Sequence, residues 1–161
     1  MTHRFPAAED RIEYSPSVAA ILAQETAVSQ LGRLFVRFTA ALLDQDTSRI
    51  DEVVSTNARF HELEEAGLPP GPLGFKLFRK QLNGAFPDEH VTIVSMAFPE
   101  RGIIETELSC TATHSGELMG HPGTGHAVRF TVYTRNRFDG DRMAERWDRM
   151  DVPALIAQLK P

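Results

Sequence analysis

Hydrophobic positions divide the chain into a helical first half and a strand-rich second half. Apolar residues recur at three- and four-residue steps over residues 28–42, which predicts an amphipathic helix within residues 15–44. This segment forms either one helix or two helices broken near residues 29–32. Residues 1–14 are expected to be a loose polar arm, and residues 15–28 an N-terminal extension of the domain.

Two further helices are predicted before the strands begin. A short one starts at Asp46 or Thr47 and ends near Thr56. The next follows the turn at residues 69–72 and ends at residues 87–88. Its apolar residues define one buried face: Phe75, Phe78, Leu82 and Phe86. Its polar residues are expected to face solvent: Lys76, Arg79, Lys80 and Asn83.

Strand-like runs dominate the second half of the chain. They cover about residues 90–98, 102–114, 126–138 and 141–150, and Asp139-Gly140 joins the last two as a hairpin. A short closing helix starts after Asp151. Helices followed by antiparallel strands predict an α+β fold, with helices packed on one face of a curved sheet. Such a sheet leaves a pocket that alternate strand residues line.

Composition narrows the class of protein. A length of 161 residues suits one domain, so we interpret residues 1–161 as a single domain. The net charge of −5 provides no basic footprint for nucleic acid, and no apolar run approaches the roughly 20 residues of a membrane helix. The single cysteine, Cys110, allows no internal disulfide and predicts a reducing, cytoplasmic location.

Polar residues on apolar strand faces are the candidates for chemistry. Thr134 and Asn136 share a face with Phe130, so each either bonds a neighbouring backbone group or holds a substrate oxygen. Phe130 and Phe78 are expected to contact the substrate.

The last strand offers two carboxylates, and a bulge there would exchange its two faces. Asp151 is well placed to cap the closing helix, so Asp148 is the preferred acid. Arg146, Trp147 and Asp151 remain candidate substrate contacts.

The histidines are candidates for weaker roles. His114 ends a strand and either bonds the following turn or contacts substrate, and His61 precedes a loop at the expected mouth of the pocket. His114, His121 and His126 lack the regular spacing of zinc ligands, so no metal is expected.

Six short motifs, in order, resemble those of the SnoaL-like polyketide cyclase family, and the resemblance covers residues 29–161. They are Gly71-Pro72-Leu73-Gly74-Phe75, Ala85-Phe86-Pro87-Asp88, Thr113-His114-Ser115-Gly116, Gly120-His121-Pro122-Gly123-Thr124-Gly125, Arg137-Phe138-Asp139-Gly140 and Glu145-Arg146-Trp147-Asp148. The resemblance implies a cone-shaped barrel of the nuclear-transport-factor-2-like group, closed by the N-terminal helices. It also implies a homodimer formed through the outer sheet face.

The resemblance further implies a reaction. In these cyclases an aspartate on the last strand, here Asp148, is the acid and base of an intramolecular aldol closure that needs no cofactor. The expected function is a lyase or isomerase of this type on a small polyketide-like or aromatic molecule, with His61 and His114 as catalytic partners. The family's histidine on the preceding strand is replaced by Thr134. Two alternatives stay open: a noncatalytic small-molecule-binding domain, and an epoxide-opening hydrolase that uses Arg146, Asp148 and Asp151.

Overall fold

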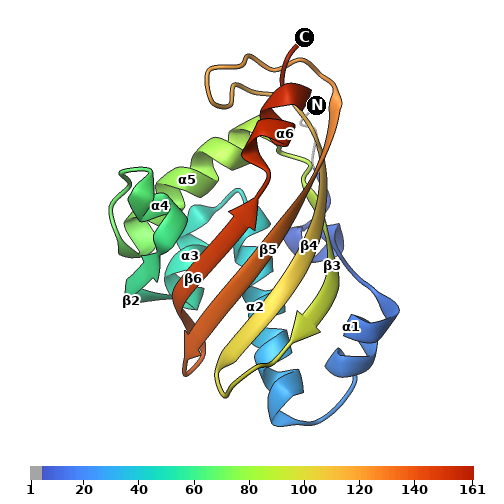
Figure 1. Cartoon of the computed structure of the whole chain (residues 1–161), viewed down its shortest axis with the longest axis vertical. Coiled ribbons are helices and arrows are strands. Elements are labelled where there is room, and N and C mark those ends of the chain that lie inside the picture. The colour runs from blue at the N-terminus through green and yellow to red at the C-terminus, as the bar shows by residue number, and fades with distance from the viewer. Residues whose placement is uncertain (1–4) are drawn as a thin grey trace.

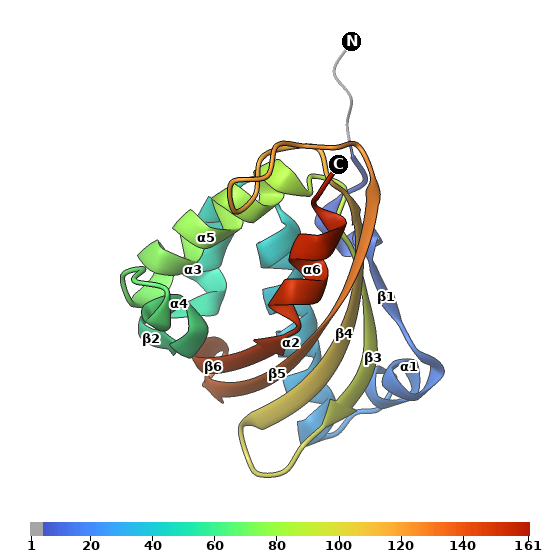
Figure 2. The same ribbon diagram turned by 45° about the horizontal axis from the view of Figure 1, so that its top comes forward.

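A curled six-stranded sheet wraps around helices on its concave side in the computed structural model, which describes residues 5–161 (Figures 1 and 2). The strand order is β1-β3-β4-β5-β6-β2, where β1 runs parallel to β3, β2 runs parallel to β6, and the other neighbours are antiparallel. The α+β fold is therefore confirmed. The sheet curls without closing into a barrel, because β1 and β2 remain separate edges.

The elements follow one another with short connections. In chain order they are η1 (Ala8–Arg11), β1 (Ile12–Tyr14), α1 (Pro16–Leu22), α2 (Ala27–Leu43), η2 (Thr47–Arg49), α3 (Ile50–Val53), β2 (Val54–Phe60), α4 (His61–Glu65), α5 (Gly71–Ala85), β3 (His90–Ala97), β4 (Ile103–Thr113), β5 (Ala127–Asp139), β6 (Arg142–Met150) and α6 (Val152–Gln158). Within residues 5–161, no helix is long and apolar enough to span a bilayer.

The first predicted helix is two helices, and their break lies at residues 23–26 rather than near residues 29–32. Local capping explains the position. The Ser15 hydroxyl accepts a hydrogen bond from the Val18 amide at 3.3 Å, and the Thr26 hydroxyl accepts one from the Ser29 amide at 3.2 Å. Each side chain satisfies one of the unpaired amides at a helix start.

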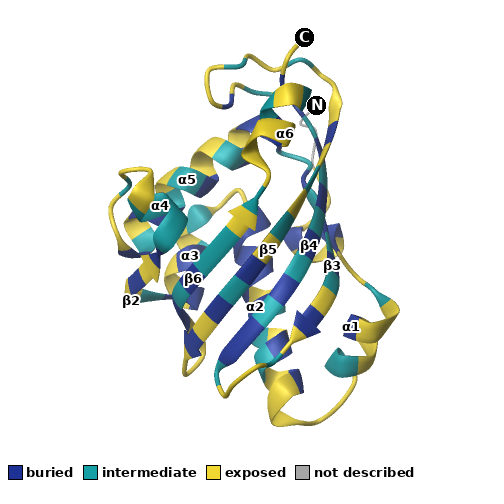
Figure 3. Cartoon of the chain, viewed as in Figure 1, coloured by how far each residue is buried: buried dark blue, intermediate teal, exposed yellow. Residues whose placement is uncertain are grey.

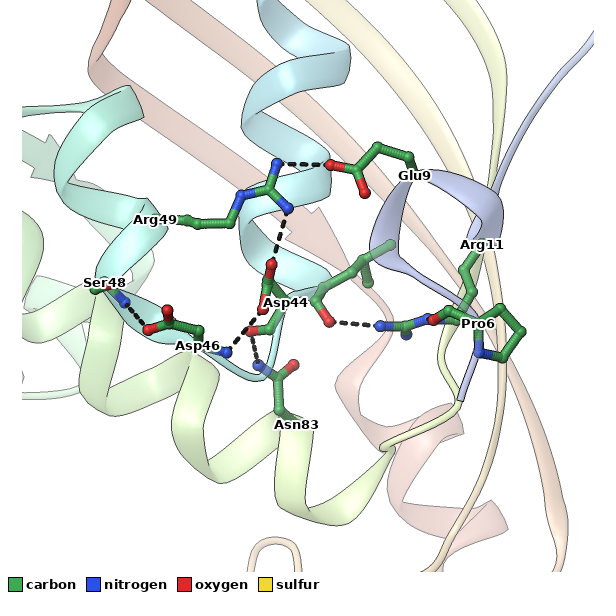
Figure 4. A network of polar contacts seen from close by, with 9 residues as sticks. Pro6, Glu9, Arg11, Asp44, Asp46, Ser48, Arg49 and Asn83 are labelled. Atoms are coloured by element: carbon green, nitrogen blue, oxygen red, sulfur yellow. Dashed lines mark hydrogen bonds and ion pairs between the residues drawn. The ribbon is translucent and has the colours of Figure 1, made fainter. Parts of the chain in front are cut away.

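Residues 5–14, expected to be a loose arm, instead form η1 and β1; residues 1–4 lie outside the described part of the chain. Arg11 fixes this segment. Its guanidinium is buried and donates to the carbonyls of Leu43 at 2.6 Å, Glu89 at 2.8 Å and Pro6 at 3.0 Å. Figure 4 shows Arg11 beside Pro6 at the end of α2, and Arg49 reaching Glu9.

Strand β2 begins where we expected a short helix to end, and no strand was expected there. It pairs parallel with β6, and its register shifts between Val54 and Arg59. The polar, irregular stretch Val54–Phe60 carries little strand periodicity of its own. Pairing with a strand more than eighty positions away in the chain, as Val54 does with Met143, creates this element.

Helix α5 buries two residues that we expected on its exposed face. Arg79 and Asn83 are only 5% and 4% exposed, so that prediction is wrong for both. Arg79 donates to the Leu42 carbonyl at 2.9 Å, to Asn83 Oδ1 at 2.8 Å and to Glu89 Oε1 at 3.0 Å. The buried face of α5 is therefore wider than its apolar residues indicate, because Asn83 and Glu89 form hydrogen bonds with Arg79 in the interior.

The alternating burial of β4 and β5 agrees with the expected strand faces (Figure 3). Gly140 turns the β5–β6 hairpin with a φ of 60°, which a glycine adopts without strain. A register shift between Arg137 and Phe138 places the adjacent Met143 and Ala144 both in buried positions. Beyond this bulge, alternate residues of β6 face the concave side.

Two glycines of α5 provide a matched test of this packing. A Cβ on Gly74 would lie 1.8 Å from the Pro69 carbonyl oxygen, whereas a Cβ on exposed Gly84 meets nothing within 4 Å. We expect Gly74→Ala to lower the free energy of unfolding by about 2 kcal/mol or more, because the backbone must move. Gly84→Ala should raise it by about 0.5–1 kcal/mol. Urea denaturation measures both, and equal effects would contradict the packing described.

Candidate functional site

A cavity of about 670 Å³ lies between the concave face of the sheet and the helices. Apolar side chains from both layers make up most of its wall: Leu42, Phe75, Phe78, Leu108, Phe130 and Val132. This volume is in the range of small-molecule sites, and it suits a drug-sized, largely hydrophobic ligand. Phe78 and Phe130 therefore lie where a substrate contact was expected.

One wall of the cavity carries an arginine–aspartate pair. Arg146 and Asp148, two residues apart on β6, both line the cavity, and Arg146 Nε donates to Asp148 Oδ1 at 2.6 Å. Arg146 is 5% exposed, and its guanidinium lies 5.1 Å from the centre of the Phe38 ring. The Asp148 side chain keeps 32% of its surface accessible. Asp148 thus presents a carboxylate to the cavity while an always-charged partner holds one of its oxygens.

Buried polar residues support this pair from behind. Asn136 Oδ1 accepts a hydrogen bond from Arg146 Nη1 at 3.4 Å, and Asn136 Nδ2 donates to the Ile104 carbonyl at 3.1 Å and to Thr134 Oγ1 at 2.8 Å. Thr134 shares a 2.5 Å hydrogen bond with Thr106. Thr134 pairs with Asp148 across the β5–β6 ladder, yet its hydroxyl is occupied by these two neighbours. Thr134 and Asn136 orient Arg146 and do not line the cavity.

His61 and Trp147 lie together outside the cavity. The His61 ring stacks on Trp147 with centroids 4.8 Å apart, and its Nε2 donates to Glu145 Oε2 at 2.7 Å. Burial raises the pKa of Glu145, but hydrogen bonds from His61 and Arg137 outweigh it, so the pKa is lowered overall. His61 therefore fastens the start of α4 to β6, and the next two residues of α4, Glu62 and Leu63, line the cavity.

His114 is buried at the end of β4, also away from the cavity lining. Its Nδ1 lies 3.2 Å from Thr124 Oγ1, and its ring meets Phe86 edge-on at 6.1 Å between centroids. Within residues 5–161, His114 Nε2 is the only buried side-chain nitrogen or oxygen without a hydrogen-bond partner. The geometry matches the structural alternative, a histidine that fixes the turn after its strand.

Asp151 caps α6, which confirms its expected structural role. Its Oδ1 accepts a hydrogen bond from the Ala154 amide at 3.0 Å, and the side chain is exposed on an outer groove between β5 and α6. Asp148 and Asp151 therefore face different sides of the sheet. The pair of aspartates that an epoxide-opening site needs does not converge here.

Sequence reasoning missed a second charged pair in the cavity wall. Arg79 and Glu89 both line the cavity, close to Cys110. Burial, above all, and then the charge of Glu89 raise the pKa of the Cys110 thiol well above its usual range, so Cys110 is not an activated nucleophile. The spacing from Phe75 to Arg79 to Phe86 was a usable signal, because it places the arginine on the buried stripe of α5.

Within residues 5–161, no group of three or more histidine, cysteine, aspartate or glutamate side chains gathers in a position to hold an ion.

Solved structures share this architecture. IdmH from Streptomyces antibioticus, a proposed polyketide cyclase, is 25% identical with a TM-score of 0.68, over 81% of this chain and 98% of its own. AclR from Streptomyces galilaeus, a proposed hydroxylase, is 22% identical with a TM-score of 0.67, over 83% and 82%. TsrD from Streptomyces laurentii is 19% identical with a TM-score of 0.69, over 84% and 96%.

A search of curated protein sequences gave no match. The family model of the SnoaL-like polyketide cyclases, in contrast, matches residues 33–159, which include the cavity walls and the Arg146–Asp148 pair. The chain belongs to the SnoaL-like polyketide cyclase family.

Proposed function

We propose that this protein is an acid/base enzyme of the polyketide cyclase type, in which Asp148 moves a proton of a small, oxygenated, largely hydrophobic substrate. The observation that carries the proposal is the Asp148 carboxylate in the wall of an apolar cavity, with Oδ1 held by Arg146 at 2.6 Å. Family membership and the likeness to IdmH support the reaction class.

The proposed reaction is an intramolecular aldol closure. Asp148 Oδ2 takes a proton from a carbon that lies between two carbonyl groups, and the electron pair of that C–H bond becomes an enolate. The enolate carbon then attacks a second carbonyl of the same molecule, so a C–C bond forms and that oxygen becomes an alkoxide. The protonated Asp148 returns its proton to the alkoxide. Each proton and electron pair is accounted for by the substrate and this one carboxyl group.

Arg146 would supply the electrostatic part of this reaction. Its hydrogen bonds to Asp148 and Asn136 use Nε and Nη1, which leaves Nη2 to the enolate oxygen. A fixed donor in a water-poor cavity stabilises developing negative charge more than water does, because it needs no reorganisation. In this scheme Asn136 and Thr134 are positioning residues, and His61 and His114 act on the structure rather than on the substrate.

A noncatalytic ligand-binding domain is the alternative that one observation favours. The residue opposite Asp148 on β5 is Thr134, whose hydroxyl is bonded to Thr106 and Asn136 and contributes no second acid or base to the cavity. A protein of this kind would bind the same ligands without converting them.

Replacing Asp148 separates the two functions. We expect Asp148→Asn to lower kcat for cyclisation of a linear aromatic diketone by about 10²–10⁴-fold, because it removes the acid/base group, and to leave product affinity nearly unchanged. Asp151→Asn is the matched control, since asparagine also caps helices, and it should keep full activity. Unchanged turnover in Asp148→Asn would refute the acid/base proposal, and wild-type protein that binds without turnover would favour the alternative.

The His61–Glu145 contact between α4 and β6 should stabilise the fold in a pH-dependent way. The pKa of Glu145 is lowered in the folded state, so its stabilising contribution is present above the unfolded pKa and is lost as the pH falls through the folded value. Glu145→Gln should therefore be less stable than wild type at pH 7, and the difference in unfolding free energy should shrink below about pH 4. Urea denaturation at a series of pH values measures this difference, and a difference that is the same at pH 7 and below pH 4 would contradict the role given to Glu145.

We also propose that the outer face of β5 is the homodimer surface that the family resemblance implies. Tyr133 is 44% exposed on this face, where the Arg149 guanidinium lies 5.2 Å from its ring centre. A charge at this position would be desolvated in a dimer. Tyr133→Glu should shift the sedimentation coefficient from dimer to monomer, and a wild-type monomer at micromolar concentration would rule this surface out.

A further inference from the structure

The cavity has a second polar end that the proposed reaction does not use. Arg79 of α5 and Glu89, which directly precedes β3, both line it, and they form a buried ion pair at 3.0 Å. Their side chains are only 6% and 5% exposed. Burying two charges costs several kcal/mol of desolvation even when they are paired. The pair binds the end of α2 through the Leu42 carbonyl, and it also lies in the cavity wall, where a ligand can reach it.

The hydrogen bonds of Arg79 leave one nitrogen for a ligand. Nε donates to the Leu42 carbonyl at 2.9 Å, and Nη2 donates to Asn83 and Glu89. Within residues 5–161, Nη1 makes no hydrogen bond. It is also not fully buried, because the only fully buried side-chain nitrogen or oxygen without a partner there is His114 Nε2. Because Arg79 lines the cavity, Nη1 can donate to an oxygen inside it.

The two charged pairs come from different levels of the sheet. Asp148 pairs with Thr134 on β5. Glu89 directly precedes His90, which pairs with Thr111 on β4, and Thr111 in turn pairs with Arg129 on β5. Five residues of strand separate positions 134 and 129, or about 16 Å along β5. Cys110, which also lines the cavity, pairs with Phe130 on β5, one residue from the row that contains Arg129.

We propose that Arg79 is a second substrate-binding group, positioned by Glu89, that donates a hydrogen bond from Nη1 to a carbonyl or phenol oxygen at the end of the substrate remote from Asp148. This inference rests on the proposed function in that it treats the cavity as the substrate site. Arg79 would make the enzyme selective for long molecules that are oxygenated at both ends.

Charge balance further defines the ligand. Glu62 and two ion pairs, Arg79–Glu89 and Arg146–Asp148, line the cavity, whereas the guanidinium of Arg149 lies over Tyr133 on the outer face. Each of the two pairs is neutral by itself. A ligand with an uncharged oxygen at each end and an apolar middle matches this pattern, whereas a carboxylate beside Arg79 would be repelled by Glu89.

Two matched probes test the inference by equilibrium binding, without turnover. Wild-type protein should bind trans-4,4′-dihydroxystilbene about tenfold more tightly than trans-4-hydroxystilbene, which lacks the second oxygen; tenfold is about 1.4 kcal/mol. The double variant Arg79→Met/Glu89→Leu should reduce this ratio to less than twofold. Paired replacement of a buried ion pair by apolar residues usually preserves folding. The surface variant Arg37→Met/Asp141→Asn is the control and should keep the wild-type ratio.

A third variant tests the role of Glu89 with almost no change of shape. Glu89→Gln leaves Arg79 as an uncompensated cation, so it should bind trans-stilbene-4-carboxylate at least tenfold more tightly than wild type does. A wild-type ratio below twofold for the phenol probes, failure of both probes to bind, or an unchanged ratio in the double variant would each overturn the inference. The turnover of Asp148→Asn reports on the proposed function separately, so the two failures are distinguishable.

Discussion

The structure depends on the constraint that a charge taken out of water must be paired. Arg146 is buried in the cavity wall, and its guanidinium is compensated by Asp148, by Asn136 and by the face of Phe38. The same contacts that satisfy the arginine also position the carboxylate. Removing either partner would leave the other uncompensated in a cavity of low polarity, so the fold and the proposed chemistry rely on one interaction.

The same constraint joins the helices to the sheet. The last carbonyls of α2 have no partner within the helix, and two buried arginines from distant segments bind them: Arg79 bonds Leu42, and Arg11 bonds Leu43. Positive charge is favourable at a helix C-terminus, because the backbone dipoles leave a partial negative charge there. Glu89 is central to this arrangement, since its carboxylate pairs with Arg79 and its carbonyl accepts from Arg11.

Local patterns in the sequence were enough to predict the curled α+β fold and the faces of β4 and β5, whereas they left the direction of Asp148 open, because a bulge exchanges the faces of β6. The fold and these strand faces depend on periodicity and on the hairpin at Asp139-Gly140, which neighbouring residues specify. Features that depend on long-range pairing were missed, above all β1, β2 and the burial of Arg79. An arginine on a helix normally predicts solvent, and only the distant carbonyl of Leu42 and the carboxylate of Glu89 reverse that preference.

The roles of the two histidines in the candidate site could not be predicted for a similar reason. His61 and His114 were candidates because imidazole suits proton transfer near neutral pH. The residue type does not indicate, however, whether the side chain points into the cavity. His61 is turned outward by its stack on Trp147, and His114 is enclosed beside Phe86. In the proposed reaction Asp148 and Arg146 are the reactive pair, and the carboxyl group of Asp148 both takes and returns the proton. Such a reaction suits a substrate whose own carbonyls make that proton acidic.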